Sequence, residues 1–127
     1  MAAIYFKDPE PGSLSDINQI KTLICYLLQE AGQPLSEDQM NIVFQTHHLV
    51  NYFNFNQALT ELLKSNHLEP YTDNFGSKKL MLTGIGVETA NTLADALPIS
   101  VRDRVSGTVK KILKEEMQGA ASLAVSL

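Results

Sequence analysis

The sequence predicts an α+β fold in which three helices are followed by a β-hairpin and two more helices. Three observations lead to this prediction. Apolar residues recur at helical spacing in three segments between residues 14 and 66. Two short segments, 68–72 and 79–83, have the pattern of strands and are joined by the turn-forming run 73–77. Two further helical segments follow the hairpin and extend to about residue 118.

The first helix is expected to begin near Ser13 or Ser15, after a loose arm formed by residues 1–13. It should end at Gly32, because glycine readily adopts the left-handed conformation of a helix stop. Its apolar stripe consists of Leu14, Ile17, Ile20, Ile24, Leu27, Leu28 and Ala31. Three more apolar residues lie outside this stripe: Leu23, Cys25 and Tyr26. A helix that is apolar on more than one side needs cover on both, which indicates a partner chain.

The second helix has a clear start signal. Ser36 is the expected cap and Gln39 completes a capping box, with two acidic residues in the first turn. Four residues are expected to face inward: Met40, Val43, Phe44 and His47. The segment 48–53 is then the turn to the third helix.

The third helix is expected to begin at Asn54, with Gln57 at capping-box spacing. The residues of its inward side are Phe55, Leu59, Leu62, Leu63 and Asn66. Those of its outward side are Gln57, Thr60, Glu61 and Lys64. A buried helix with a polar outer face, followed by a hairpin, is the core of a winged helix-turn-helix. The prediction is therefore a recognition helix over 55–66 and a β-hairpin wing over 68–83.

After the hairpin, Thr83 offers a cap for a fourth helix over about 85–96, and Ser100 one for a fifth. The fifth helix should end at Gly119. Its apolar side consists of Val101, Val105, Val109, Ile112 and Leu113. The expected division is an arm (1–13), a winged helix-turn-helix domain (14–83), C-terminal helices that form a dimerisation element (84–118) and a tail (119–127). For the tail, disorder and packing on a partner both remain open.

Composition restricts the class of protein. Of the 127 residues, 44% are hydrophobic and 19% charged, as in an ordinary globular domain. The single Cys25 excludes an internal disulfide and suits a reducing compartment. We find no signal-peptide pattern and no apolar stretch long enough for a bilayer, so a soluble cytoplasmic protein without membrane contact is expected.

Three elements of the sequence resemble a bacterial family of uncharacterised winged-helix proteins, whose members are labelled as transcriptional regulators: the segment Asn51–Leu62, the element Leu82-Thr83-x-x-Gly86, and Leu97-Pro98 leading to Arg102. The resemblance covers residues 16–116. It implies a winged-helix fold and DNA binding, but no particular operator, ligand or effector. The family also has a small C-terminal β-rich domain. This chain shows no strand-like segment after Met117, so the resemblance does not carry over the functions of that domain, such as effector sensing, and a small-molecule effector stays unknown.

The leading hypothesis is a transcriptional regulator that binds double-stranded DNA as a homodimer, on a pseudo-palindromic site. The candidate DNA-binding residues are Asn54, Gln57, Thr60 and Lys64 on the third helix, with Lys78 and Lys79 on the wing. The alternatives are a solvated helix face for the former and a charged hairpin edge for the latter. At Tyr52, core packing is favoured over a phosphate contact.

Charge argues against a strong DNA binder, because phosphate contacts need lysine and arginine. The net charge is −4 and the pI near 5.2, and residues 15–83 hold four basic against seven acidic side chains. The alternative hypothesis is therefore a winged-helix module that binds proteins and has lost DNA binding. No catalytic motif is present, and the adjacent His47 and His48 point about 100° apart on a helix. An enzyme, a metal site and a cofactor are not expected.

Overall fold

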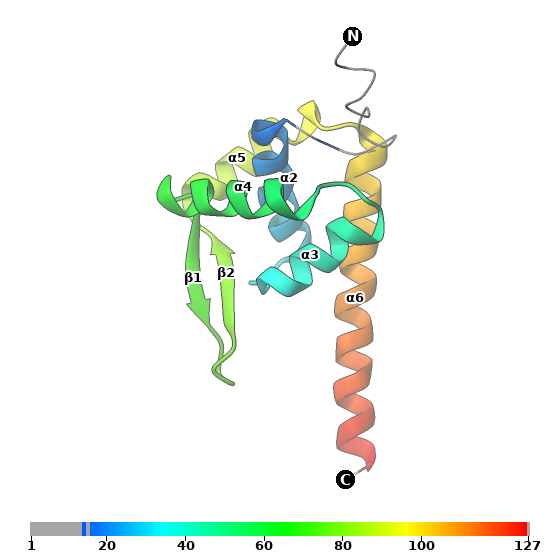
Figure 1. Cartoon of the computed structure of the whole chain (residues 1–127). Coiled ribbons are helices and arrows are strands. Elements are labelled where there is room, and N and C mark those ends of the chain that lie inside the picture. The colour runs from blue at the N-terminus through cyan, green and yellow to red at the C-terminus, as the bar shows by residue number, and fades with distance from the viewer. Residues whose placement is uncertain (1–13, 15, 127) are drawn as a thin grey trace.

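The computed structural model describes Leu14 and residues 16–126, with side chains up to Glu116 (Figure 1). These residues form five α-helices, a short 3₁₀ helix and one antiparallel hairpin, which confirms a mixed α+β fold. The elements are α2 (Ile17–Ala31), α3 (Glu37–Thr46), α4 (Tyr52–Lys64), β1 (Leu68–Thr72), β2 (Lys78–Leu82), α5 (Gly84–Leu93), η1 (Ala94–Ala96) and α6 (Ile99–Ser126). Their order and packing are compatible with a winged-helix-like arrangement. The predicted arm, residues 1–13, lies outside the described residues.

The first two helices largely follow their predicted signals. α2 ends at Gly32, whose φ of 68° is left-handed, but it is capped by Asp16 rather than by Ser13 or Ser15. The Asp16 carboxylate accepts the Asn18 N–H at 2.8 Å. At the start of α3 the predicted capping box is confirmed, because Ser36 and Gln39 each accept the backbone N–H of the other.

The start and the end of α4 were predicted wrongly. Its cap is Asn51, whose side chain accepts the N–H of Asn54 at 2.7 Å, so Asn54 lies inside the first turn. At the other end, Asn66 has a φ of 63°, and the N–H of His67 donates to the carbonyl of Leu62. This is a Schellman ending, so Asn66 is the left-handed residue after the helix and not part of its inward side.

The hairpin pairs Leu68 with Leu82 and Thr72 with Lys78, so β2 begins one residue earlier than predicted. Leu80 also exchanges two backbone hydrogen bonds with Leu35, at 3.1 and 2.8 Å, which ties the hairpin to the segment before α3. Because both polar backbone groups of Leu80 point toward Leu35, its partner Pro70 faces the open edge of β1. A proline there loses no ladder bond and interrupts the edge against pairing with another chain.

The core surrounds α2, which packs against α4 on one side and against α5 and α6 on others. Of the three residues taken as a sign of a partner chain, Leu23 and Cys25 are fully buried by this single chain and Tyr26 is half-buried. The C-terminal helices supply a second cover for α2, so its apolar character does not by itself require a partner chain, and a partner on α2 stays a prediction. Most apolar side chains of α2 are buried inside the protomer, and Ile17, Tyr26 and Ala31 are half-buried.

The C-terminal helices confirm some predicted boundaries and contradict others. Thr83 caps α5 as predicted, and Val101, Val105 and Val109 of α6 are buried. α6 begins at Ile99, so Ser100 lies inside it and is not the cap. The helix also continues through Gly119, the predicted stop, to Ser126, since an interior glycine costs only about 1 kcal/mol. No helix within the described part of the chain is long and apolar enough to cross a membrane.

Candidate nucleic-acid interface

The outward face of α4 is the first part of the candidate site. Phe55, Ala58, Leu59 and Leu62 are buried, and the ring of Phe55 packs edge-on against Phe44 with centroids 5.6 Å apart. This anchoring fixes which side of the helix faces solvent. A shallow hollow of about 450 Å³ lies on that side and is lined by Tyr52, Phe53, Asn56, Gln57 and Thr60.

The predicted readers on α4 are not all on this face. Gln57, Thr60 and Lys64 are exposed, whereas Asn54 is half-buried in the first turn and its backbone N–H is already bonded. The hydroxyl of Thr60 donates to the Asn56 carbonyl at 3.0 Å, so that hydroxyl is satisfied within the helix. The structure therefore brings three of the four together and leaves Asn54 aside.

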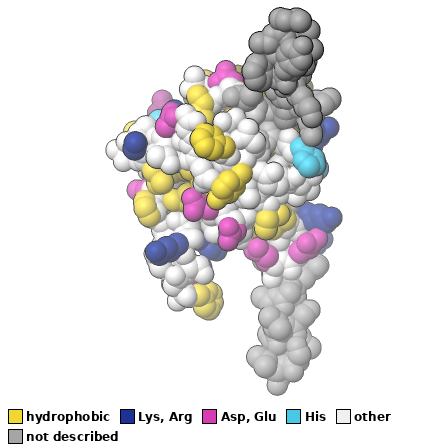
Figure 2. Space-filling view, viewed as in Figure 1, with side chains coloured by type: hydrophobic (Ala, Val, Ile, Leu, Met, Phe, Trp, Pro, Cys, Tyr) yellow, Lys and Arg dark blue, Asp and Glu magenta, His cyan; other side chains and the backbone are white. Residues whose placement is uncertain are grey.

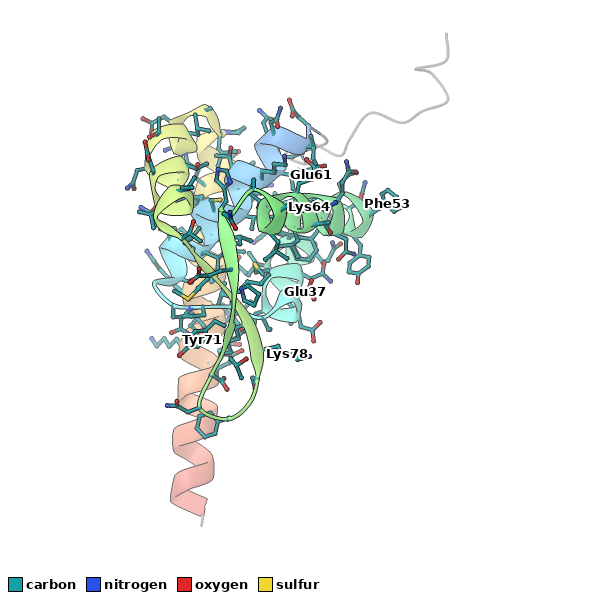
Figure 3. All side chains as sticks on the ribbon, turned by 90° about the vertical axis from the view of Figure 1, so that its left-hand side faces the viewer. Glu37, Phe53, Glu61, Lys64, Tyr71 and Lys78 are labelled. Carbon is teal, nitrogen blue, oxygen red and sulfur yellow. The ribbon has the colours of Figure 1, made fainter. Side chains whose placement is uncertain are left out.

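Glu61 lies in an ion pair that the sequence did not predict. Its carboxylate contacts the ammonium group of Lys21 on α2 at 2.5 Å and accepts the Gln57 amide at 3.1 Å (Figure 3 labels Glu61). The hydrogen bond from Lys21, followed by that from Gln57, lowers the pKa of Glu61. An unpaired carboxylate on this face would repel phosphate, but Lys21 compensates the charge of Glu61 locally.

The two wing lysines have different surroundings. Lys79 is half-buried and its ammonium group lies 3.6 Å from the carboxylate of Asp73. That carboxylate accepts the backbone N–H groups of Phe75 and Ser77, both at 2.9 Å, and these bonds, with Ser77 the larger cause, lower the pKa of Asp73. Asp73 thus holds the turn of the hairpin, and Lys79 is partly engaged there. Lys78 is exposed and makes no ion pair within the described residues.

A second hollow, of about 520 Å³, separates the hairpin from the start of α3. It is lined by Ser36, Glu37, Asp38, Leu63, Pro70, Tyr71, Thr72, Lys78, Lys79 and Leu80. Figure 3 shows Glu37, Lys78 and the α4 residue Phe53 projecting to the same side of the protein. In Figure 2 that side carries yellow and magenta side chains, with dark blue ones mainly toward its edges. The face is therefore of mixed character and is not a basic patch.

Tyr52 and Phe53 are the residues of this face that sequence reasoning misjudged. Core packing was favoured for Tyr52, but it is 61% exposed, and Phe53, which received no role, is 78% exposed. Their exposure follows from the start of α4 at Tyr52. Phe53 then lies about 200° around the helix from the buried Phe55. A correct choice of Asn51 as the cap would have been the signal that places Phe53 outward.

Two of the histidines are hydrogen-bonded to nearby hydroxyl groups, and the cysteine is buried. His47 shares a 2.7 Å hydrogen bond with the hydroxyl of Thr108 on α6, and His67 shares one with Ser65. Burial raises the pKa of the Cys25 thiol to about 12, so little thiolate is present at neutral pH. Among the residues that the structure describes, no group of three or more His, Cys, Asp or Glu side chains is placed to hold a metal ion.

Comparison with known proteins gives one match. Residues 20–125 match a family described as "Domain of unknown function (DUF4364)". No curated protein and no solved structure matches the chain. Because the match covers most of the sequence, the chain belongs to this family, and an uncharacterised family is what the resemblance in the sequence predicted.

Proposed function

We propose that this member of the DUF4364 family is a winged-helix transcriptional regulator that binds duplex DNA with α4 and the β1–β2 hairpin. One observation supports this proposal above the others: α4 is anchored by one buried side while its opposite side stays exposed next to a hairpin. In winged helices such a helix enters the major groove and the hairpin reaches the neighbouring backbone. The family resemblance of the sequence points the same way.

The number of exposed lysines near the outward face of α4 predicts how strongly DNA binding depends on salt. Lys64, in the last turn of α4, and Lys78, on the hairpin, are exposed, whereas Lys21 and Lys79 are engaged by carboxylates. Two protomers that each place these two lysines on phosphates make four contacts. The slope of log affinity against log salt is then about −3.6, which is shallow for a regulator.

A homodimer remains part of the proposal, through the last helix alone and not through the first helix as well. α2 is covered by its own chain, so the surface for a second copy is assigned to α6. Figure 1 shows the C-terminal part of α6 extending away from the rest of the protein. Ile112 and Leu113, on the last stretch of α6 with described side chains, are only half-buried. Two-fold pairing there brings two α4 helices onto one pseudo-palindromic site.

A second candidate function is a winged-helix module that binds a protein partner. The observation that favours it is the exposure of Phe53 and Tyr52 in a chain of net charge −4. Exposed aromatic residues are common at protein interfaces, and acidic residues oppose phosphate. Salt dependence and charge removal separate the two candidates.

The test is fluorescence anisotropy of the purified protein with duplex DNA from upstream of its own coding region, at several salt concentrations. We expect saturable binding, with a scrambled duplex bound more weakly. The double variant Lys64→Ala/Lys78→Ala should flatten the salt slope toward zero, whereas Lys111→Ala, which removes an exposed charge from α6, should leave it unchanged. A folded protein that binds no duplex at low salt contradicts the proposal and favours the protein-binding alternative.

A further inference from the structure

We infer that α4 recognises A·T base pairs, with Phe53 against thymine methyl groups and the amides of Asn56 and Gln57 on adenine. This inference rests on the proposed DNA-binding function and deepens it to a class of base pair. It follows from the chemistry of the hollow on α4, from the positions of the arginines and from the hydrogen bonds around Gln57.

The hollow presents its side chains in rows along the helix. Phe53, the pair Asn56 and Gln57, and Thr60 follow each other at intervals of three or four residues. Such intervals place side chains on one face, about 5 Å apart along the helix axis. A helix in the major groove therefore offers the ring of Phe53, then the amides of Asn56 and Gln57, then the methyl group of Thr60. Asn56 is half-buried and donates one amide hydrogen to the Tyr52 carbonyl at 3.2 Å, which leaves its second hydrogen and its oxygen for a base.

This set of groups matches the major-groove edge of A·T pairs. Adenine shows N7 and N6–H₂ there, which one amide can bind with two hydrogen bonds, and thymine shows a methyl group that suits an apolar contact. Guanine is read chiefly by arginine, or by lysine. The only arginines in the sequence are Arg102 and Arg104, both in α6, and the only lysine of α4 is Lys64 in its last turn. The hollow is lined by no arginine or lysine, the residues that read guanine best.

The hydrogen bonds around Gln57 leave it able to bind adenine. An amide nitrogen carries two hydrogens, and Gln57 donates one of them to Glu61, which Lys21 holds in turn. The second hydrogen and the amide oxygen remain for N7 and N6–H₂ of adenine. The chain Lys21–Glu61–Gln57 also fixes the direction of this amide before DNA binds, which lowers the entropic cost of binding.

The test measures the affinity of the full chain for three duplexes at low salt: alternating A·T, alternating G·C, and A·T with uracil in place of thymine. We expect the A·T duplex to bind about tenfold more tightly than the G·C duplex, as one well-made amide–adenine pair provides. Replacing thymine by uracil removes only the methyl group, and should weaken binding about fourfold for each contacted thymine. In Phe53→Ala this uracil effect should disappear.

Matched controls separate recognition from folding. Ile85 is an exposed apolar residue of α5 on the other side of α2, so Ile85→Ala should keep the full uracil effect. In a duplex with 7-deazaadenine, which lacks the N7 acceptor, the wild-type protein should lose affinity, and the double variant Asn56→Ala/Gln57→Ala should lose none.

Two different failures are distinguishable. If no duplex binds at low salt, the proposed function itself is wrong, and the inference falls with it. If duplex DNA binds but A·T and G·C are equal, or if uracil weakens Phe53→Ala as much as the wild type, the A·T reading is wrong while DNA binding stands.

Discussion

Replacing Gly86 with alanine should destabilise the protein, although the position is inside a helix where alanine is normally the better residue. A Cβ at Gly86 would lie 2.2 Å from the carbonyl oxygen of His67 and 2.8 Å from a methyl carbon of Leu82. The first of these neighbours is backbone and cannot rotate away. α5 therefore approaches the start of β1 so closely that only glycine fits.

The size of the effect follows from this distance. Ordinary contact with a Cβ begins at 3.4 Å, so α5 and the His67 backbone must separate by about 1.2 Å. Overpacking of this kind costs about 1–3 kcal/mol. The shift also strains two hydrogen bonds of the same junction, from Thr83 N–H to the His67 carbonyl and from Gly86 N–H to Thr83 Oγ1, each worth about 1 kcal/mol. The higher helix propensity of alanine relative to glycine offsets about 1 kcal/mol of this loss. The net loss is about 2 kcal/mol, or roughly 10 °C in Tm.

Gly107 provides the matched control. It lies inside α6, and a Cβ there meets nothing within 4 Å. Gly107→Ala should therefore stabilise the protein by about 0.5–1 kcal/mol through helix propensity alone. Urea unfolding followed by circular dichroism measures both variants. Equal effects of the two substitutions, or a Gly86→Ala variant as stable as the wild type, would refute the close approach of α5 to β1.

Three further predictions concern stability and reactivity. His48 has a φ of 53° after α3, so His48→Gly should raise the unfolding free energy by about 0.5–1 kcal/mol in urea titrations, and a loss would contradict the left-handed ending. Cys25, with a pKa near 12, should resist a thiol reagent at pH 8 until the protein is unfolded; rapid labelling of the native protein would show that the core is open. The pKa values of Glu61 and Asp73 are lowered on folding, so their contribution is complete above the unfolded values near 4.5 and 3.8 and is lost as pH falls through the lower folded values. Thermal unfolding should therefore show a decline in stability below about pH 4.5, smaller in Asp73→Asn.

The fold was predictable where the signal is local and unopposed. Gly32, the Ser36 capping box and Thr83 each have one strong candidate for their role, and all three were predicted correctly. Asn51 and Asn54 compete for the same role, since either can cap a helix. In the structure Asn51 is the cap, and its side chain accepts the N–H of the competing Asn54.

The covering of α2 was beyond local reasoning. The sequence shows that the helix is apolar on more than one side, but it does not show whether α5 and α6 or a second protomer provides the cover. The apolar pattern requires only that Leu23 and Cys25 be covered, and in the structure α5 and α6 belong to the chain that covers them. The same limit applies to the candidate site: the Lys21–Glu61 contact joins residues forty positions apart, and no periodicity predicts it.

The Leu82-Thr83-x-x-Gly86 element fixes the position of the hairpin relative to α4, and so connects stability with the candidate DNA-binding face. Thr83 Oγ1 donates to the carbonyl of Asn66, just after α4, and accepts the Gly86 N–H at the start of α5. One threonine thus joins the end of the candidate recognition helix, the end of β2 and α5. The element lies away from the hollow on α4, so its effect on binding must be indirect. If the protein binds DNA as a winged helix, Gly86→Ala should lower both the unfolding free energy and the affinity for DNA. Phe53→Ala should lower the affinity for DNA alone.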